Sequence, residues 1–360
     1  MQHAIGCITN AAFEEQGKEQ LLAHEQSLAP SSSHEASTPS ASILEAAARI
    51  VDSNPSGESF GGSAPGVLRA KAMRLLLNVS ASTGIRALVG KGGGLRFLVR
   101  VFEEQVAACC KAKYSAAAGN SVSYGQDALD TTLGLLMNLG LDDGRAAELL
   151  SQGVLAPLAS LLQQCPWDSC LARGASAAAR LVRFPQGAKQ GRECGVLQGL
   201  LQLLKKAAGT ASTSGAAPFP PPAGAAAAPS DAQAQILDPC VRALAQALRN
   251  DTASVVLVGE DMTALLALVA AVKCGREGTV GNAALALQTV ANREEAIPEC
   301  LKRLAQAGCI PALLNVVHHM RGPAQKNAAL ALARIVKREE NLAVLKALHG
   351  IDILNCYLKL

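Results

Sequence analysis

The stretch that decides the fold runs from Ala128 to Leu162 and has the sequence ALDTTLGLLMNLGLDDGRAAELLSQGVLAPLASLL. Its first part is apolar with helical spacing, and the helix is predicted to end near Leu139. The Asp-Asp-Gly triplet at 142–144 breaks it, because Asp and Gly favour helix ends and turns. A short helix is predicted over Arg145–Leu150, Gly153 stops it, and VLAPLASLL begins the next helix. One unit therefore joins short helices by tight turns.

The same order of elements recurs along the chain. It is found again in Lys71–Phe102, Ala175–Leu204, Arg242–Val269, Asn282–Val317 and Asn327–Leu358. The helix position of Asn138 recurs at Asn10, Asn78, Arg180, Gln246, Gln288 and about Arg334. Asn138 and Arg180 are 42 residues apart, within the ~40–47 residues of armadillo and HEAT units. The pattern predicts an all-α, armadillo/HEAT-like right-handed superhelical solenoid of about seven repeats, the first one incomplete.

Stretches rich in Gly, Ser, Pro and Ala lengthen some of the spacings. They predict inserted loops at about 52–66 and 107–125, and a flexible linker at 207–232 that contains ASTSGAAPFPPPAGAAAAPS. We expect N-terminal repeats over 1–206 and C-terminal repeats over 233–360. The missing front of the first unit indicates that an upstream portion was lost or that Met1 is not the true start.

Composition argues against several functional classes. Apolar residues make up 49% of the 360 residues and aromatic residues only 3%, so a repeated stacking platform for nucleic acid is not expected. The net charge of +4 is small for this length. No apolar run approaches the ~20 residues of a membrane span, and the N-terminus does not resemble a signal peptide. The 11 scattered cysteines are predicted to be reduced thiols in a cytoplasmic protein.

The motifs that suggest chemistry are all incomplete. The glycine cluster at 90–94 lacks the spacing of a phosphate-binding loop and fits a turn between helices. Cys165 and Cys170 have no second pair at zinc-finger spacing, and Cys109-Cys110 and His318-His319 are adjacent pairs. We therefore predict no catalytic residue, no metal, no cofactor and no small-molecule substrate, and a protein that is not an enzyme.

The repeat pattern resembles the armadillo repeat family. The match is best at Gly153–Leu162, Gly308–Leu314 and Leu135–Leu139. A narrower resemblance covers Gly281–Leu360, with GNAALAL, KNAALALARIV and LKALHGIDILN, and is to the C-terminal armadillo region of the tetratricopeptide repeat protein 12 family. That resemblance implies a cytoplasmic role in preassembling axonemal dynein arms, with dynein subunits and chaperones as partners.

The armadillo resemblance also implies where a partner binds. In that family the third helix of each unit lines a concave groove, where Asn side chains clamp an extended peptide backbone. Asn10, Asn78 and Asn138 match that position. Family members that bind basic import signals carry a Trp four residues earlier, where this chain has Gly6, Arg74 and Gly134. The absence of Trp there argues against that ligand.

Basic residues stand near the same positions. The candidate groove residues are Arg74, Arg180, Arg183, Arg242, Gln246, Arg249, Arg334, Lys337 and Arg338. We predict a broken basic stripe that receives an acidic partner segment, because Arg can form two parallel hydrogen bonds to a carboxylate. The alternative is a set of solvated side chains whose stems lie over the core.

The sequence therefore predicts a scaffold that binds other proteins, without nucleic acid or membrane. The first alternative is a general armadillo adaptor in ubiquitin ligase or trafficking complexes, and the alternative from another class is an enzyme. An upstream U-box or F-box would favour the adaptor, whereas upstream tetratricopeptide repeats would favour dynein arm assembly.

One prediction concerns the linker. Because its composition is that of a flexible segment, limited proteolysis of the native chain is expected to cut first between Ala207 and Ser230. Fragment masses identify the site. A linker that resists cleavage while other segments are cut would contradict a division into two blocks.

Overall fold

The structure, a computed structural model, describes residues 2–27, 42–53, 64–90, 94–112, 119–209, 231–297 and 299–358, which are helical with short turns and contain no strand. It divides into two compact units, Met1–Arg180 and Leu181–Leu360. The helices of the first unit are α1 (Gln2–Ala11), α2 (Glu15–Ser27), α3 (Ile43–Asp52), α4 (Ala64–Ser80), α5 (Thr83–Arg86), α6 (Arg96–Ala112), α7 (Gly119–Leu139), α8 (Asp143–Ser151), α9 (Leu155–Gln164) and α10 (Asp168–Leu181). Those of the second are α11 (Pro185–Glu193), α12 (Val196–Gly209), α13 (Asp231–Asn250), α14 (Thr252–Glu260), α15 (Met262–Val272), α16 (Glu277–Ala291), α17 (Cys300–Gln306), α18 (Cys309–His319), α19 (Gly322–Ile335), α20 (Glu339–Ala347) and α21 (Gly350–Leu358).

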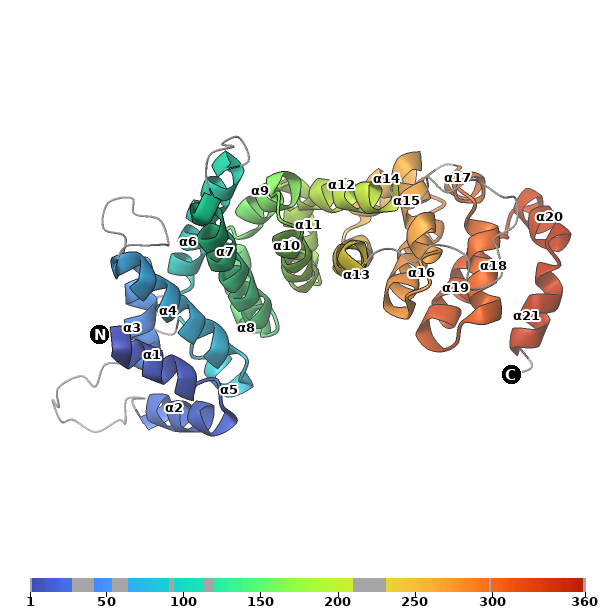
Figure 1. Ribbon diagram of the computed structural model, residues 1–360. Coiled ribbons are helices and arrows are strands. Elements are labelled where there is room, and N and C mark those ends of the chain that lie inside the picture. Colours follow the sequence, from blue (N-terminus) through green and yellow to red (C-terminus); the bar gives the residue numbers. More distant parts are fainter. Residues whose placement is uncertain are drawn as a thin grey trace. The chain divides into compact units, whose positions relative to one another are not determined.

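The helices follow one order of three per repeat, as α8, α9 and α10 illustrate (Figure 1). The third helices are α1, α4, α7 and α10 in the first unit and α13, α16 and α19 in the second. The described chain starts with a third helix and ends with a first and a second helix, α20 and α21. The prediction of an all-α repeat fold is therefore confirmed.

Local sequence explains where the helices start and stop. Asp142 caps α8 by accepting a hydrogen bond from the Arg145 backbone N–H at 2.9 Å, which satisfies a donor that the helix leaves unpaired. Gly153, between α8 and α9, has a φ of 81°, which glycine adopts without a steric penalty. Gly195 and Gly308 hold the same place in two other repeats, with φ values of 91° and 80°. The breaks predicted from Asp and Gly are confirmed.

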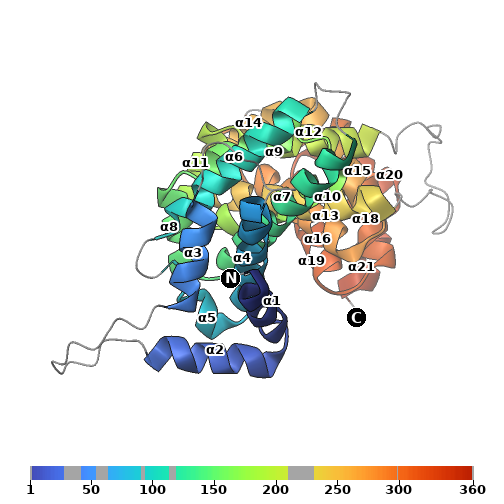
Figure 2. The same ribbon diagram turned by 60° about the vertical axis from the view of Figure 1, so that its left-hand side comes forward.

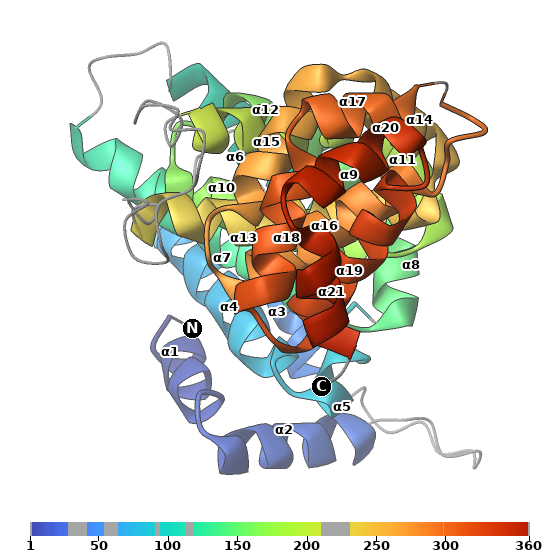
Figure 3. The ribbon, with the colours of Figure 1, turned by 90° about the vertical axis from the view of Figure 1, so that its right-hand side faces the viewer.

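The third helices pack side by side within each unit. In the first unit α4 lies between α1 and α7, and Figure 2 shows α3 beside α4 and α6. In the second unit α16 lies between α13 and α19, and Figure 3 looks onto the last repeats, where α21 lies against α18. Small residues allow the close approach: a Cβ added to Gly281 on α16 would lie 3.6 Å from the Ala324 Cα on α19.

The structure divides the chain at a different place from the predicted linker. Residues 210–230, most of that linker, lie outside the described residues, but the helices on both sides of them, α12 and α13, pack against each other in the second unit. The Cys240 thiol on α13 donates a hydrogen bond to the Leu200 carbonyl on α12 at 3.0 Å. The stack of helices therefore continues across the linker.

The predicted inserted loops are shorter than the sequence suggested. Helix α6 extends to Ala112 and α7 begins at Gly119, so helices occupy both ends of the predicted loop at 107–125. Helix α4 likewise begins at Ala64, inside the loop predicted at about 52–66. Residues 54–63 and 113–118, where the remainder of these loops was predicted, lie outside the described residues.

Within the described ranges no single helix is long and apolar enough to cross a membrane. One bent pair, α14 with α15, passes by length and composition, and its two helices meet at 93°.

Charged side chains tie the repeats of the second unit together. The Lys205 ammonium on α12 donates to the Asp261 carboxylate at 2.6 Å, and Asp261 also caps α15 by accepting from the Thr263 and Ala264 backbone N–H groups. Burial alone would raise the pKa of Asp261, but hydrogen bonds from Lys205, Thr263 and Ala264 outweigh it and lower the pKa to about 2. The ionised carboxylate is therefore favoured in the folded state.

Acid is expected to weaken this tie. Because the folded-state pKa lies below the value of the unfolded chain, the stabilisation is complete above about pH 4–5 and is lost as the pH falls towards 2. When the pH falls from 5 to 2, the free energy of unfolding is expected to decrease in both proteins. The decrease should be about 1–2 kcal/mol smaller in Asp261→Asn than in the wild type. Denaturant unfolding measures the difference. Asp168→Asn, an exposed change in the other unit, is the control, and equal acid losses in wild type and Asp261→Asn would contradict the expectation.

Candidate functional site

Side chains near the C-terminal ends of the third helices reach from one repeat to the preceding one. The Asn78 amide nitrogen on α4 donates to the Thr9 carbonyl on α1 at 3.4 Å. The Asn138 amide nitrogen on α7 donates to the Leu77 carbonyl at 3.3 Å and to the Ser80 hydroxyl at 3.1 Å, both on α4. The two amides occupy equivalent places, so they form a ladder of hydrogen bonds across the first three third helices.

Arg180 continues this ladder. Its guanidinium on α10 donates to the Met137 carbonyl on α7, the residue before Asn138. The last carbonyls of a helix have no partner within the helix. The ladder side chains supply those partners from the next repeat, and they therefore contribute to the stack.

The structure changes what the predicted Asn residues can offer a partner. The amide nitrogens of Asn78 and Asn138 already donate within the stack, and both side chains are half-buried. Their amide oxygens make no hydrogen bond with the described residues and can accept from a partner's backbone N–H. Asn10 and Arg74 are exposed. Among the predicted groove residues of α1, α4 and α7, Asn10 and Arg74 are the two whose N–H groups remain available to a partner.

In the second unit, Asn250 makes a bond to the preceding repeat like those of Asn78 and Asn138, whereas Gln246 is the position that aligns with Asn138 in the sequence. The Asn250 amide nitrogen, at the end of α13, donates to the Arg183 carbonyl at 3.0 Å and to the Gln246 carbonyl at 2.9 Å. Gln246 lies one turn earlier and is half-buried. The Arg183 guanidinium packs over the Phe184 ring, 4.3 Å from its centre, a favourable cation–π position.

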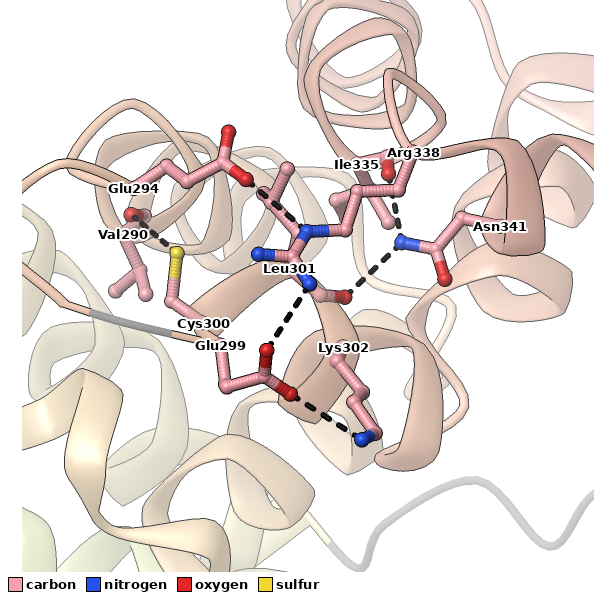
Figure 4. Close-up of polar contacts among 9 residues, drawn as sticks. All are labelled: Val290, Glu294, Glu299, Cys300, Leu301, Lys302, Ile335, Arg338 and Asn341. Atoms are coloured by element: carbon pink, nitrogen blue, oxygen red, sulfur yellow. Dashed lines mark hydrogen bonds and ion pairs between the residues drawn. The ribbon is translucent and has the colours of Figure 1, made fainter.

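Two of the predicted arginines are paired with carboxylates of this chain. Arg242 donates to Asp238 at 2.5 Å, one turn earlier on α13. Arg338 precedes α20, and its Nε donates to Glu294 at 3.0 Å while its Nη1 donates to Glu299 at 3.2 Å (Figure 4). These bonds, with Glu294 first, raise the pKa of Arg338.

The surroundings of Arg338 show a structural role (Figure 4). Glu299 begins α17 with a φ of 66° and also pairs with Lys302 at 3.2 Å. Nearby, the buried Asn341 amide donates to the Leu301 carbonyl at 3.1 Å and to the Ile335 carbonyl at 2.7 Å. Arg338 thus joins two consecutive repeats, and its cation is shared with carboxylates of this chain. The predicted basic stripe is correspondingly weaker there.

Four exposed cations of the second unit lie at or near the C-terminal ends of its third helices. Arg249 and Arg334 are the last but one residues of α13 and α19, Arg293 follows α16 by two residues, and Lys337 follows α19 by two residues. We call these four residues the cation row. All four side chains are exposed, and none forms an ion pair with a described residue. The carboxylate of Glu295, also exposed, lies close in sequence to Arg293 and offsets part of its charge.

Sequence reasoning missed two members of this surface. Arg293 was not counted as a groove residue, although it follows the aligned helix end. Asn327 on α19 donates to the Gly281 carbonyl on α16 at 3.0 Å. The sequence motif NAALAL, which begins at Asn282 and again at Asn327, could have indicated this bond. The two asparagines are equivalent, and the acceptor Gly281 comes immediately before the first of them.

Comparisons with known proteins support the fold. No protein-family model and no curated protein matches this chain. A designed armadillo repeat protein is 19% identical with a TM-score of 0.57, over 81% of this chain and 99% of that one. A second, solved in complex with the peptide (KR)4, is 18% identical with a TM-score of 0.54, over 81% and 99%. An engineered protein is 17% identical with a TM-score of 0.56, over 98% and 89%. At these identities the likeness shows an armadillo-type fold alone.

The ladder has a measurable structural role. Asn138→Ala is expected to lower the free energy of unfolding by about 1 kcal/mol, because the Leu77 carbonyl and the Ser80 hydroxyl lose the hydrogen bonds that come from the next repeat. Asn10→Ala is the matched control and should be nearly neutral, since that side chain is exposed. Denaturant unfolding compares them, and an Asn138→Ala protein as stable as the wild type would show that the amide does not support the stack.

Proposed function

We propose that this chain is a scaffold for protein–protein interaction, and that its second unit binds an extended acidic segment of a partner across α13, α16 and α19. The observation that carries the proposal is the cation row. Each of three neighbouring third helices has, within two residues of its C-terminal end, an exposed arginine with no carboxylate partner among the described residues. Arginine binds carboxylates through two parallel hydrogen bonds, so an acidic chain suits this surface.

The middle helix supplies groups for the backbone of such a segment. Asn282, Gln288 and Asn292 are half-buried or exposed along α16 and the turn after it. Each amide has both a donor and an acceptor, which are the groups an extended backbone can pair with. The proposed surface therefore combines amides in the middle with guanidiniums beside them.

A purely structural role for the cation row is the competing explanation. Cations near a helix C-terminus are favourable because the last carbonyls carry partial negative charge, by about 0.3–1 kcal/mol at exposed sites. That effect acts on stability and does not depend on a partner. Binding and stability measurements on the same variants therefore separate the two explanations.

A similar fold already holds a charged peptide. The designed armadillo repeat protein solved with (KR)4 binds a basic chain, whereas the cation row would repel one. We propose the opposite charge preference for this chain, because like charges facing each other across an interface are unfavourable.

The identity of the partner is a narrower proposal. The resemblance of Gly281–Leu360 supports dynein subunits and chaperones, and a role in axonemal dynein arm assembly in the cytoplasm. No comparison with known proteins adds to that resemblance. The alternative is a general adaptor in ubiquitin ligase or trafficking complexes. A pull-down from ciliated-cell extract, analysed by mass spectrometry, distinguishes them: dynein chains with chaperones favour the first, and ligase or trafficking subunits favour the second.

Charge reversal tests the proposed surface directly. Arg249→Glu with Arg334→Glu should weaken binding of an alternating Asp-Glu peptide, of the same length as (KR)4, by about tenfold or more. Fluorescence anisotropy measures the affinity, which should also fall with added salt.

Lys189→Glu with Lys346→Glu is the matched control, because both lysines are exposed in the second unit but lie on first helices. This control changes the net charge equally and should bind nearly as tightly as the wild type. Equal losses in both double variants would mean that only overall charge matters. Preference of the wild type for (KR)4 over the acidic peptide would overturn the proposal.

A further inference from the structure

Three cysteines that are distant in sequence meet in the first unit. Cys109 lies on α6, Cys165 follows α9 directly, and Cys170 lies on α10. The Cys109 thiol donates a hydrogen bond to the Cys165 sulfur at 3.5 Å, across 56 residues of sequence. The Cys170 thiol donates to the Gln126 carbonyl at 4.0 Å. All three side chains are buried, Cys165 being the most accessible at 8%.

The arrangement favours thiol chemistry over metal binding. No three His, Cys, Asp or Glu side chains of the described residues are placed to hold a metal ion. The Cys165 sulfur, however, accepts a hydrogen bond from Cys109, and this bond, followed by the neighbouring Cys170 thiol, lowers the pKa of Cys165. Interaction with Cys165, together with burial, raises the pKa of the Cys109 and Cys170 thiols. Cys165 is therefore the thiol that most readily becomes the nucleophilic thiolate.

We propose that Cys109 and Cys165 are a modification site, where a peroxide forms a reversible disulfide. The Cys165 thiolate attacks one oxygen of hydrogen peroxide, the O–O bond breaks, and the departing hydroxide takes up a proton to become water. The Cys109 thiol sulfur then attacks the sulfenic sulfur, the S–O bond breaks, and the departing hydroxide takes up the Cys109 thiol proton to leave as a second water. Two thiols lose two electrons in total, and the peroxide gains them.

The bond would join consecutive repeats. Cys109 belongs to the second helix of the third repeat, and Cys165 ends the second helix of the fourth. A cross-link that closes 56 residues of chain restricts the unfolded state and stabilises the first unit. Neither cysteine lies on a third helix, so the disulfide would not cover the exposed side of the third helices.

Peptide mapping tests the proposal. The reduced full-length protein is treated with hydrogen peroxide, remaining thiols are alkylated under denaturing conditions, and tryptic peptides are identified by mass spectrometry. The expected product links Val101–Lys111 to Ala146–Arg173, with a mass lower by two hydrogen atoms than the sum of the two peptides. The link should disappear on reduction, and the thermal unfolding midpoint should be higher in the oxidised protein.

Because each linked peptide holds two cysteines, variants assign the bond. Cys109→Ser and Cys165→Ser should lose the link, whereas Cys110→Ser, the adjacent control, should keep it. In case a buried substitution disturbs folding, the wild type oxidised in denaturant provides a second comparison, since pairing there should lose its selectivity. Oxidation confined to the exposed Cys7 and Cys194, or a Cys165–Cys170 bond that leaves Val101–Lys111 unlinked, would overturn the proposal.

Discussion

Every repeat of this chain has an apolar face that only its neighbours can cover. Helices such as α8 and α9 have 9 and 10 residues, and isolated helices shorter than about 12–15 residues are marginal in water. Their stability comes from side chains buried between repeats, such as Leu136, Leu149 and Leu158, which are almost fully buried. A repeat that lost its neighbours would lose most of this burial, so each repeat depends on the adjacent repeats for its stability.

A stack of short helices also has many helix ends. Each end leaves backbone groups without a partner inside the helix, and the burial of these ends makes their pairing obligatory. The structure solves this between repeats: Asn138 reaches the Leu77 carbonyl, and the Glu148 carboxylate accepts from the Leu95 N–H at 2.7 Å. The same side chains set the register of one repeat on the next. Polar residues at these positions are therefore required by the fold before any partner is considered.

This requirement explains which features the sequence could predict. Helix ends at Leu139 and Gly153 were predictable because caps and left-handed turns depend on neighbouring residues. The recurrence of the Asn138 position along the sequence predicted where the third helices lie. The partners of Arg338 were not predictable, since Glu294 lies 44 residues away and meets it only when two repeats pack in a particular register. The same holds for Cys109 and Cys165, whose spacing matches no local motif.

The distinction between stack and surface also separates two properties of the chain. In a repeat array, stability is approximately a sum of repeat energies and nearest-neighbour interfaces. A covalent bond between the third and fourth repeats changes one such interface, whereas Arg249 and Arg334 belong to later repeats and stay exposed. Side chains that reach a neighbouring repeat, such as Arg180 and Arg338, serve the stack. Side chains at equivalent helix ends that reach no neighbour, such as Arg249 and Arg334, contribute little to the stack and stay exposed.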